Sequence, residues 1–217
     1  MRALFILLII SFPFIGSSQD SELGNWFVFI GSKKLDNNWN WHHEVQHRNY
    51  NAAGDLEQLL LRTGLGKNLT QGNNNLLFGY GYILSSNYID DDEKVDVNEH
   101  RLFLQFISKQ KWGRLGIQHR YRFEQRWVES DFRLRFRYFL AANYPLNNST
   151  LVTGTTYLST YNEIFLNTRG NAFDRNRLYG GLGYKASDHL RIELGYMNQF
   201  LNGGNRDQIN IIAFLNW

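Results

Sequence analysis

The sequence predicts an all-β protein, a closed antiparallel transmembrane β-barrel of 10–12 strands with a charged lumen. Apolar and polar residues alternate with a period of two, which puts them on opposite faces of a strand. The alternating runs have about 10 to 13 residues, longer than the 5–6 residues that are common in soluble domains. Aromatic residues gather near the ends of these runs, as in the girdles of outer-membrane barrels.

Residues 1–18 have the organisation of a cleavable signal peptide. Arg2 is followed by the apolar run Ala3–Ile15 and then by the small residues Gly16, Ser17 and Ser18, the order that signal peptidase substrates share. We therefore expect residues 19–217 to form one barrel domain in the outer membrane of a Gram-negative bacterium. The expected partners are outer-membrane lipid and the barrel-assembly machinery.

Composition excludes several other classes of protein. The 217 residues include no Cys and 20% charged residues, so disulfide frameworks and cysteine-based zinc or redox sites are impossible. The formal net charge is only +3, which is too small for a nucleic-acid-binding surface. We predict no catalytic, cofactor or metal site and no nucleic-acid partner.

The clearest strand runs from Leu115 to Trp127. Its apolar and aromatic residues occupy odd positions, and its even positions are Gln118, Arg120, Arg122, Glu124 and Arg126. A helix would spread these charges around its circumference, whereas a strand collects them on one face. The run Phe132–Leu140 repeats the pattern with Arg133, Arg135 and Arg137 on its polar face.

Other runs alternate in the same way and are separated by Asn-, Gly- and Asp-rich turns. They cover residues 39–46, 58–65, 76–84, 101–106, 190–196 and 208–217. In the last run, Ile212 and Phe214 are apolar at positions where strict alternation would have polar residues. In total 11 strands can be marked, whereas single-chain bacterial barrels have even numbers. The run 25–33 would start on the wrong side if the last strand ended in the periplasm. Either a further strand makes 12, or 25–33 is no wall strand and the barrel has 10.

Loops and the last residue suggest an orientation. Ser86–Val97 and Thr168–Asp174 suit long outer loops, and Pro145–Ser149 and Ala186–His189 suit short periplasmic turns. Trp217 ends an alternating strand, which resembles the C-terminal assembly signal of bacterial outer-membrane barrels.

If lipid covers the apolar face, the polar face lines the lumen. Unpaired buried charge is costly, so the guanidinium and carboxylate groups there should pair. The expected lumen charge network comprises Glu99, Arg101, Arg120, Arg122, Glu124, Arg126, Arg133, Arg135, Arg137, Glu163, Arg175, Arg177, Arg191 and Glu193. One interpretation is a rigid structural filling. The other is a narrow, porin-like, anion-preferring pore, because Arg suits phosphate and carboxylate.

Five segments resemble a bacterial family of unknown function, number twenty-four-ninety of the DUF series. They are residues 100–102, 120–126, 161–165, 176–184 and 193–196. The resemblance extends over essentially the whole chain after the signal segment. It implies an outer-membrane β-barrel and supplies no activity.

Two other functions remain open. A secreted soluble β-barrel that binds a ligand would turn its apolar face inward. An outer-membrane lipid-modifying enzyme would carry a base such as His119 on the lipid-facing wall. However, the His-x-Ser pattern of the outer-membrane phospholipase type is absent from the sequence.

Overall fold

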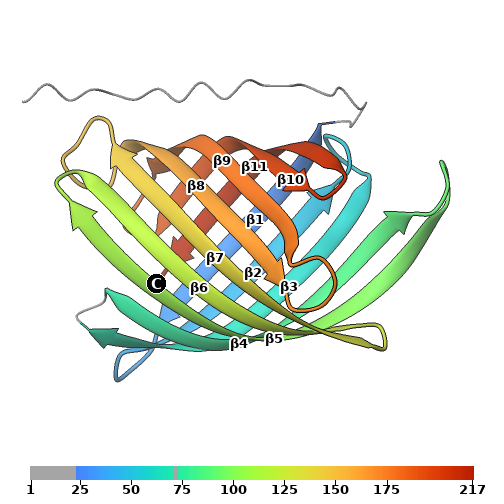
Figure 1. Ribbon diagram of the computed structural model, residues 1–217. Helices are drawn as coiled ribbons and strands as arrows, with labels where there is room; N and C mark the ends of the chain where they lie inside the picture. The colour runs from blue at the N-terminus through green and yellow to red at the C-terminus, as the bar shows by residue number, and fades with distance from the viewer. Residues whose placement is uncertain (1–22, 71–72) are drawn as a thin grey trace, which may run out of the picture.

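A computed structural model describes residues 23–70 and 73–217, so the predicted signal peptide lies outside the described residues. These residues form a closed barrel (Figure 1). Its eleven strands are β1 (Gly24–Lys34), β2 (Trp39–Asn49), β3 (Leu56–Thr70), β4 (Asn74–Tyr88), β5 (Lys94–Trp112), β6 (Leu115–Val128), β7 (Asp131–Pro145), β8 (Thr156–Asn167), β9 (Phe173–Lys185), β10 (Leu190–Leu201) and β11 (Gly204–Asn216).

No helix among the described residues is long and apolar enough to cross a membrane.

The barrel closes through a parallel pair. β1 lies between β2, with which it is antiparallel, and β11, with which it is parallel from Gly24↔Gln208 to Ser32↔Asn216. All other neighbours are antiparallel. The count of eleven lies within the predicted range of 10–12, but the expectation of an even number was wrong. An odd ring needs one parallel pair, and the run 25–33 forms it as a wall strand.

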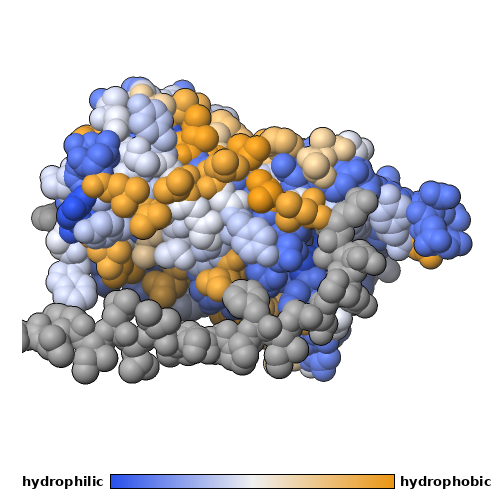
Figure 2. Space-filling view, turned by 90° about the horizontal axis from the view of Figure 1, so that it is seen from above, coloured by the Kyte–Doolittle hydropathy of each residue, from blue (hydrophilic) through white to orange (hydrophobic). Residues whose placement is uncertain are grey.

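The charged side chains of β6 and β7 and most of the apolar side chains of these strands take opposite sides of the wall. On β6 and β7, Glu124 is 0% exposed inside the barrel, whereas Phe136 is 51% exposed outside it. Figure 2 shows apolar side chains in a band across one outer face, while the part of the surface that projects at the right is hydrophilic. The alternation predicted for residues 115–140 is therefore present in the structure, with charges inward and apolar groups outward.

The two ends of the barrel can be named by their residues. At the Trp217 end, β11 stops and the connection between β7 and β8 spans residues 146–155. At the Gly24 end, β1 begins and the β4–β5 hairpin projects beyond the other strands (Figure 1).

Loop lengths do not distinguish these ends as the sequence suggested. Most of Ser86–Val97 belongs to β4 and β5, whose connection is only residues 89–93. The predicted short turn at Pro145–Ser149 is part of a ten-residue connection, 146–155. The four predicted loops do divide between the two ends as expected. Their lengths, however, do not indicate which end of the barrel would face the periplasm.

Large aromatic side chains inside the barrel lie over glycines. A Cβ added at Gly183 would lie 2.0 Å from Cζ of Tyr157, and one at Gly195 would lie 2.5 Å from the ring of Tyr179. Tyr157 and Tyr179 are 0% and 1% exposed. These glycines therefore create the room in which the two rings pack against the wall.

An aromatic cluster covers the seam at the Trp217 end. The ring of His43 lies over Gly31, where a Cβ would come within 1.9 Å of its Nε2 atom. His43 contacts Trp41 and Trp217, with ring centroids 5.0 and 5.1 Å apart. The backbone N–H of Trp217 donates to the carbonyl of Ser32 at 3.1 Å. Trp217 thus joins β11 to β1 in the structure, and its role as an assembly signal stays a prediction.

Replacing Gly183 with Ala should destabilise the barrel by about 1–3 kcal/mol, the usual cost of overpacking a filled interior. Gly180→Ala is the matched control on the same strand, because a Cβ there meets nothing within 4 Å. Thermal or urea unfolding, followed on gels by the mobility of unheated samples, measures the difference. Equal stability of both variants would contradict the packing of Tyr157 over Gly183.

Candidate functional site

The lumen has two parts with different packing. Toward the Gly24 end, side chains of β5 to β9 fill the interior. We call this group the plug: Arg101, Phe103, Arg122, Glu124, Arg135, Arg137, Glu163, Phe165 and Arg177, all of which are buried. Toward the Trp217 end, the lumen opens into a cavity of about 1010 Å³.

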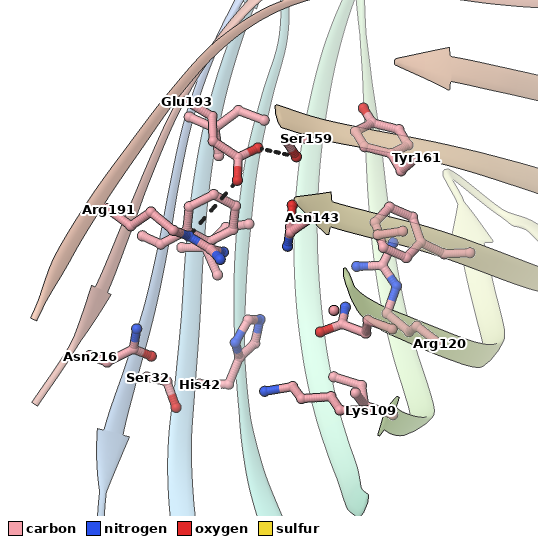
Figure 3. Close-up of a pocket in the computed structure, with 18 of the residues that line it drawn as sticks. Ser32, His42, Lys109, Arg120, Asn143, Ser159, Tyr161, Arg191, Glu193 and Asn216 are labelled. Atoms are coloured by element: carbon pink, nitrogen blue, oxygen red, sulfur yellow. Dashed lines mark hydrogen bonds and ion pairs between the residues drawn. The ribbon is translucent and has the colours of Figure 1, made fainter. Parts of the chain in front are cut away.

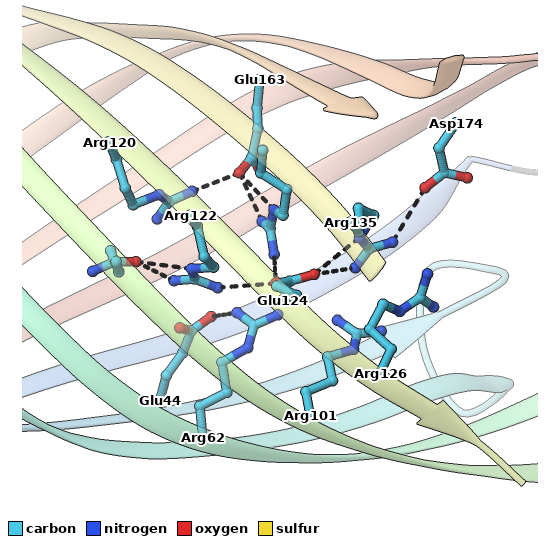
Figure 4. Close-up of polar contacts among 12 residues, drawn as sticks. Glu44, Arg62, Arg101, Arg120, Arg122, Glu124, Arg126, Arg135, Glu163 and Asp174 are labelled. Carbon is cyan, nitrogen blue, oxygen red and sulfur yellow. Dashed lines mark hydrogen bonds and ion pairs between the residues drawn. The ribbon is translucent and has the colours of Figure 1, made fainter. Parts of the chain in front are cut away.

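Glu124 is at the centre of the plug (Figure 4). Its two carboxylate oxygens accept hydrogen bonds from Arg135 Nη2 at 2.7 Å and from Arg137 Nη1 at 2.7 Å. Arg122 Nη1 is 3.6 Å from the same carboxylate. The strand pattern explains this arrangement, because β6 and β7 are antiparallel neighbours with these residues on one face. One carboxylate therefore serves three guanidinium groups.

Glu163 on β8 is the second shared carboxylate. Its Oε1 atom accepts hydrogen bonds from Arg120 Nη2 at 2.8 Å and from Arg137 Nη2 at 2.7 Å. Arg177 Nη1 lies 3.9 Å from Oε2. Since β6 and β8 are not adjacent, the pair Arg120–Glu163 connects strands that share no backbone ladder. The network therefore braces the wall across the curvature of the barrel.

Two further carboxylates extend the network toward the Gly24 end. Glu99 on β5 accepts from Arg101 at 2.5 Å and from Arg126 at 2.5 Å. Asp174 lies 3.1 Å from Arg135 and 3.2 Å from Arg175. Asp174 has no partner in the β8–β9 register, which shifts between Phe165 and Leu166. It is the extra residue of a β-bulge, a device that re-aims side chains.

Aromatic rings support the guanidinium planes. The Cζ atoms of Arg137 and Arg177 lie 4.4 and 4.6 Å from the ring centroid of Phe165. Arg177 also lies 4.7 Å from the ring of Trp26, on the far side of the seam. Such contacts are attractive and are strongest where water is excluded. They let the lumen hold more arginines than carboxylates.

The structure places most of the predicted network residues together. Arg133 is separate, since its only ion pair among the described residues is with Asp131 and both side chains are about half exposed. Arg191 and Glu193 lie apart from the plug in the cavity wall, 3.8 Å from each other. Glu193 there accepts hydrogen bonds from Tyr157 at 2.8 Å and Ser159 at 2.9 Å.

The predicted network omitted two lumen arginines, Arg48 and Arg62. Arg62 donates to Glu44 at 2.8 Å, and Arg48 donates to Gln58 at 2.6 Å and lies 3.7 Å from the ring of Trp26. The alternation of β2 and β3 places both arginines on the polar face of their strands. Asp174 could not be found from alternation, because a bulge reverses the side on which the following residues are expected.

The cavity is strongly cationic (Figure 3). Twelve Lys and Arg residues but only four Asp and Glu residues line it. Lys109 forms no ion pair with any described carboxylate. The arginines nearest the plug share Glu163 and Glu44. Positive charge therefore exceeds negative charge along the cavity wall.

The comparisons with known proteins identify a family. The sequence model of DUF2490, described as a protein of unknown function, matches residues 23–210. The chain belongs to this family. No curated protein and no solved structure matches it. Membership of DUF2490 therefore agrees with the resemblance noted in the sequence and assigns no chemistry to the lumen.

Outside the lumen, neither His119 nor the acidic residues 90–93 belong to a group of described side chains that could hold a metal ion. His119 is on the outer face, where its Nδ1 atom lies 2.9 Å from the hydroxyl of Tyr138. The acidic residues 90–93 occupy the tip of the β4–β5 hairpin. Among residues 23–70 and 73–217, no group of three or more His, Cys, Asp or Glu side chains could hold a metal ion.

Replacing Glu163 with Gln should destabilise the barrel by about 3–5 kcal/mol, because three guanidinium groups would lose a shared, buried counter-charge. Glu93→Gln is the control, since Glu93 is exposed in the hairpin tip. Urea unfolding of the two variants measures the effect. A loss below about 1 kcal/mol for Glu163→Gln would show that the network contributes little to stability.

Proposed function

We propose that this DUF2490 protein is an integral β-barrel of the Gram-negative outer membrane, reached after removal of residues 1–18. The observation that carries the proposal is a belt of large exposed apolar or aromatic side chains around the closed barrel. Every strand contributes at least one: Phe27, Val45, Leu65, Phe78, Leu104, Tyr121, Phe136, Leu158, Leu182, Leu194 and Ile211.

A bilayer is the environment that suits this surface. Contiguous apolar patches beyond a few hundred Å² are rare on soluble monomers, and lipid would cover such a belt. Closure leaves no strand edge unpaired in hydrocarbon. Each strand has at least 11 residues, and a tilted strand needs about 9–11 to cross a bilayer. A soluble ligand-binding barrel needs the reverse arrangement, with apolar side chains inside.

The plug favours a structural role for the lumen over an open pore. Glu124, Arg122 and Phe103 are at most 3% exposed, so side chains occupy the lumen at this level. The Coulomb attraction between each carboxylate and its arginines keeps the side chains in place. A narrow anion-preferring pore is the second candidate, and the cationic lining of the cavity favours it.

Fractionation tests the membrane location. The protein should remain with outer membranes after a carbonate wash and migrate faster on gels when unheated. Leu194→Arg, which places a charge near the middle of β10, should impair assembly, because a midplane Arg on the lipid face costs about 2–4 kcal/mol. Leu146→Arg is the control, since Leu146 is exposed in the β7–β8 connection. Recovery of the wild type as a soluble periplasmic protein would overturn the proposal.

Planar-bilayer recordings separate the two roles of the lumen. A plugged barrel should give no stable conductance steps, because the packed carboxylates and guanidinium groups leave no continuous water path. Anion-selective steps that diminish in Arg122→Gln and Arg135→Gln would support the pore instead. Arg133→Gln removes the same charge outside the plug and serves as the control.

A further inference from the structure

We propose that the cavity at the Trp217 end is a binding site for a small organic anion that carries both an acidic group and an apolar portion. This inference goes beyond the structural role of the barrel. Binding would depend on the side chains that line the cavity, so the site should bind the anion in detergent as well as in a bilayer.

Two cations of the cavity wall that lack a close carboxylate partner would bind the acidic group of the ligand. Lys109 on β5 and Arg191 on β10 come from distant strands and face the same space (Figure 3). Lys109 forms no hydrogen bond through its side chain with the described residues. Among the described residues, the one carboxylate that pairs with Arg191 is that of Glu193, 3.8 Å away, and it also accepts hydrogen bonds from Tyr157 and Ser159. The Cζ atom of Arg191 lies 4.0 Å from the ring centroid of Phe214. An anion between the two cations would relieve their mutual repulsion.

A buried donor at the base of the cavity supports this assignment. The side chain of Arg122 is 1% exposed and lines the cavity. Its Nη1 atom has no hydrogen-bond acceptor among the described residues, and the nearest carboxylate oxygen, on Glu124, is 3.6 Å away. Buried polar atoms are normally hydrogen-bonded. A phosphate or carboxylate oxygen is the acceptor that a guanidinium group accommodates best.

The apolar portion of the ligand is selected by another part of the wall. β1 and β11 turn Val28, Ile30, Ile212 and Phe214 into the cavity, next to the buried cluster that contains Trp26 and Met197. The cations instead come mainly from β5, β6, β7 and β9. Arg191 on β10 lies over the ring of Phe214 in this apolar wall. A ligand with its acidic group between Lys109 and Arg191 would therefore have the apolar side chains of β1 and β11 beside it.

The size of the cavity fits such a molecule. Ligand pockets commonly have about 300–1,000 Å³, and this cavity has about 1010 Å³. Its mouth at the Trp217 end carries Lys34, Lys111 and Lys185, which would attract anions from solution. The buried side chains of the plug lie at the inner side of the cavity, so we expect a ligand to enter and leave by the Trp217 end.

Calorimetric titration of the purified full chain in non-ionic detergent at low salt tests the proposal. Phenyl phosphate is the probe, inorganic phosphate lacks the apolar portion, and benzyl alcohol lacks the charge. Phenyl phosphate should bind saturably and at least tenfold more tightly than either. The proposal is overturned if phenyl phosphate shows no saturable binding. Equal binding of inorganic phosphate would overturn the contribution of the apolar wall.

Variants locate the site within the barrel. Lys109→Gln should weaken phenyl phosphate binding at least fivefold, and Lys109→Arg should retain it. Arg133→Gln removes the same charge at the other end of the barrel and should change the affinity less than twofold. Heat-dependent gel mobility verifies that each variant is folded. Equal losses in Lys109→Gln and Arg133→Gln would indicate general charge attraction and overturn the assignment.

Discussion

Each charge that is buried in the plug needs an opposite charge within reach, because packed side chains exclude water from this part of the lumen. Glu124 and Glu163 meet this need by contacting three guanidinium groups each. Sharing is possible because arginines on β6, β7 and β9 converge toward the axis from a curved wall. Arginines outnumber carboxylates in the lumen. This ratio explains both why carboxylates are shared in the plug and why positive charge exceeds negative charge along the cavity wall.

The same ratio explains why the network and the aromatic rings occur together. Ion pairs alone would leave several arginines with only part of a counter-charge. Phe165 and Trp26 offer the faces of their rings to Arg137, Arg177 and Arg48, which adds attraction without adding a carboxylate. The rings also exclude water, so each remaining ion pair acts in a medium of lower dielectric constant. Arg120–Glu163 and Arg135–Asp174 join strands that are not neighbours in the barrel, so the network links parts of the wall that share no backbone hydrogen bonds.

Much of the wall could be predicted from the sequence, because a period of two determines which residues share a face. The period of two predicts the buried charges of β6 and β7, among them Arg122, Glu124, Arg135 and Arg137. The parallel pairing of β1 with β11 could not be predicted, because the local residue pattern of a strand does not show which distant strand it pairs with when the barrel closes. Asp174 escaped for a different reason, because one inserted residue in a bulge shifts the alternation. Pro145 and the Asn residues that follow are typical of tight turns, and they predict a short turn where the structure has the ten-residue connection 146–155.

The blurred alternation of β11 has a structural meaning. Ile211 faces outward, while Ile212 and Phe214 face the cavity, so this strand is apolar on both sides from Ile211 onward. Gln208 and Asn210, which precede it, are buried polar residues. β1 behaves alike, with Phe27 outside and Val28 and Ile30 inside. These two strands form the closing pair, where no arginine-rich strand is a direct neighbour. Toward the Trp217 end the seam therefore presents apolar side chains to the lumen, and these give the cavity an apolar wall. Toward the Gly24 end, Arg206 of β11 still pairs with Glu57. A strand that departs from alternation can thus indicate where the lining of the lumen changes from charged to apolar.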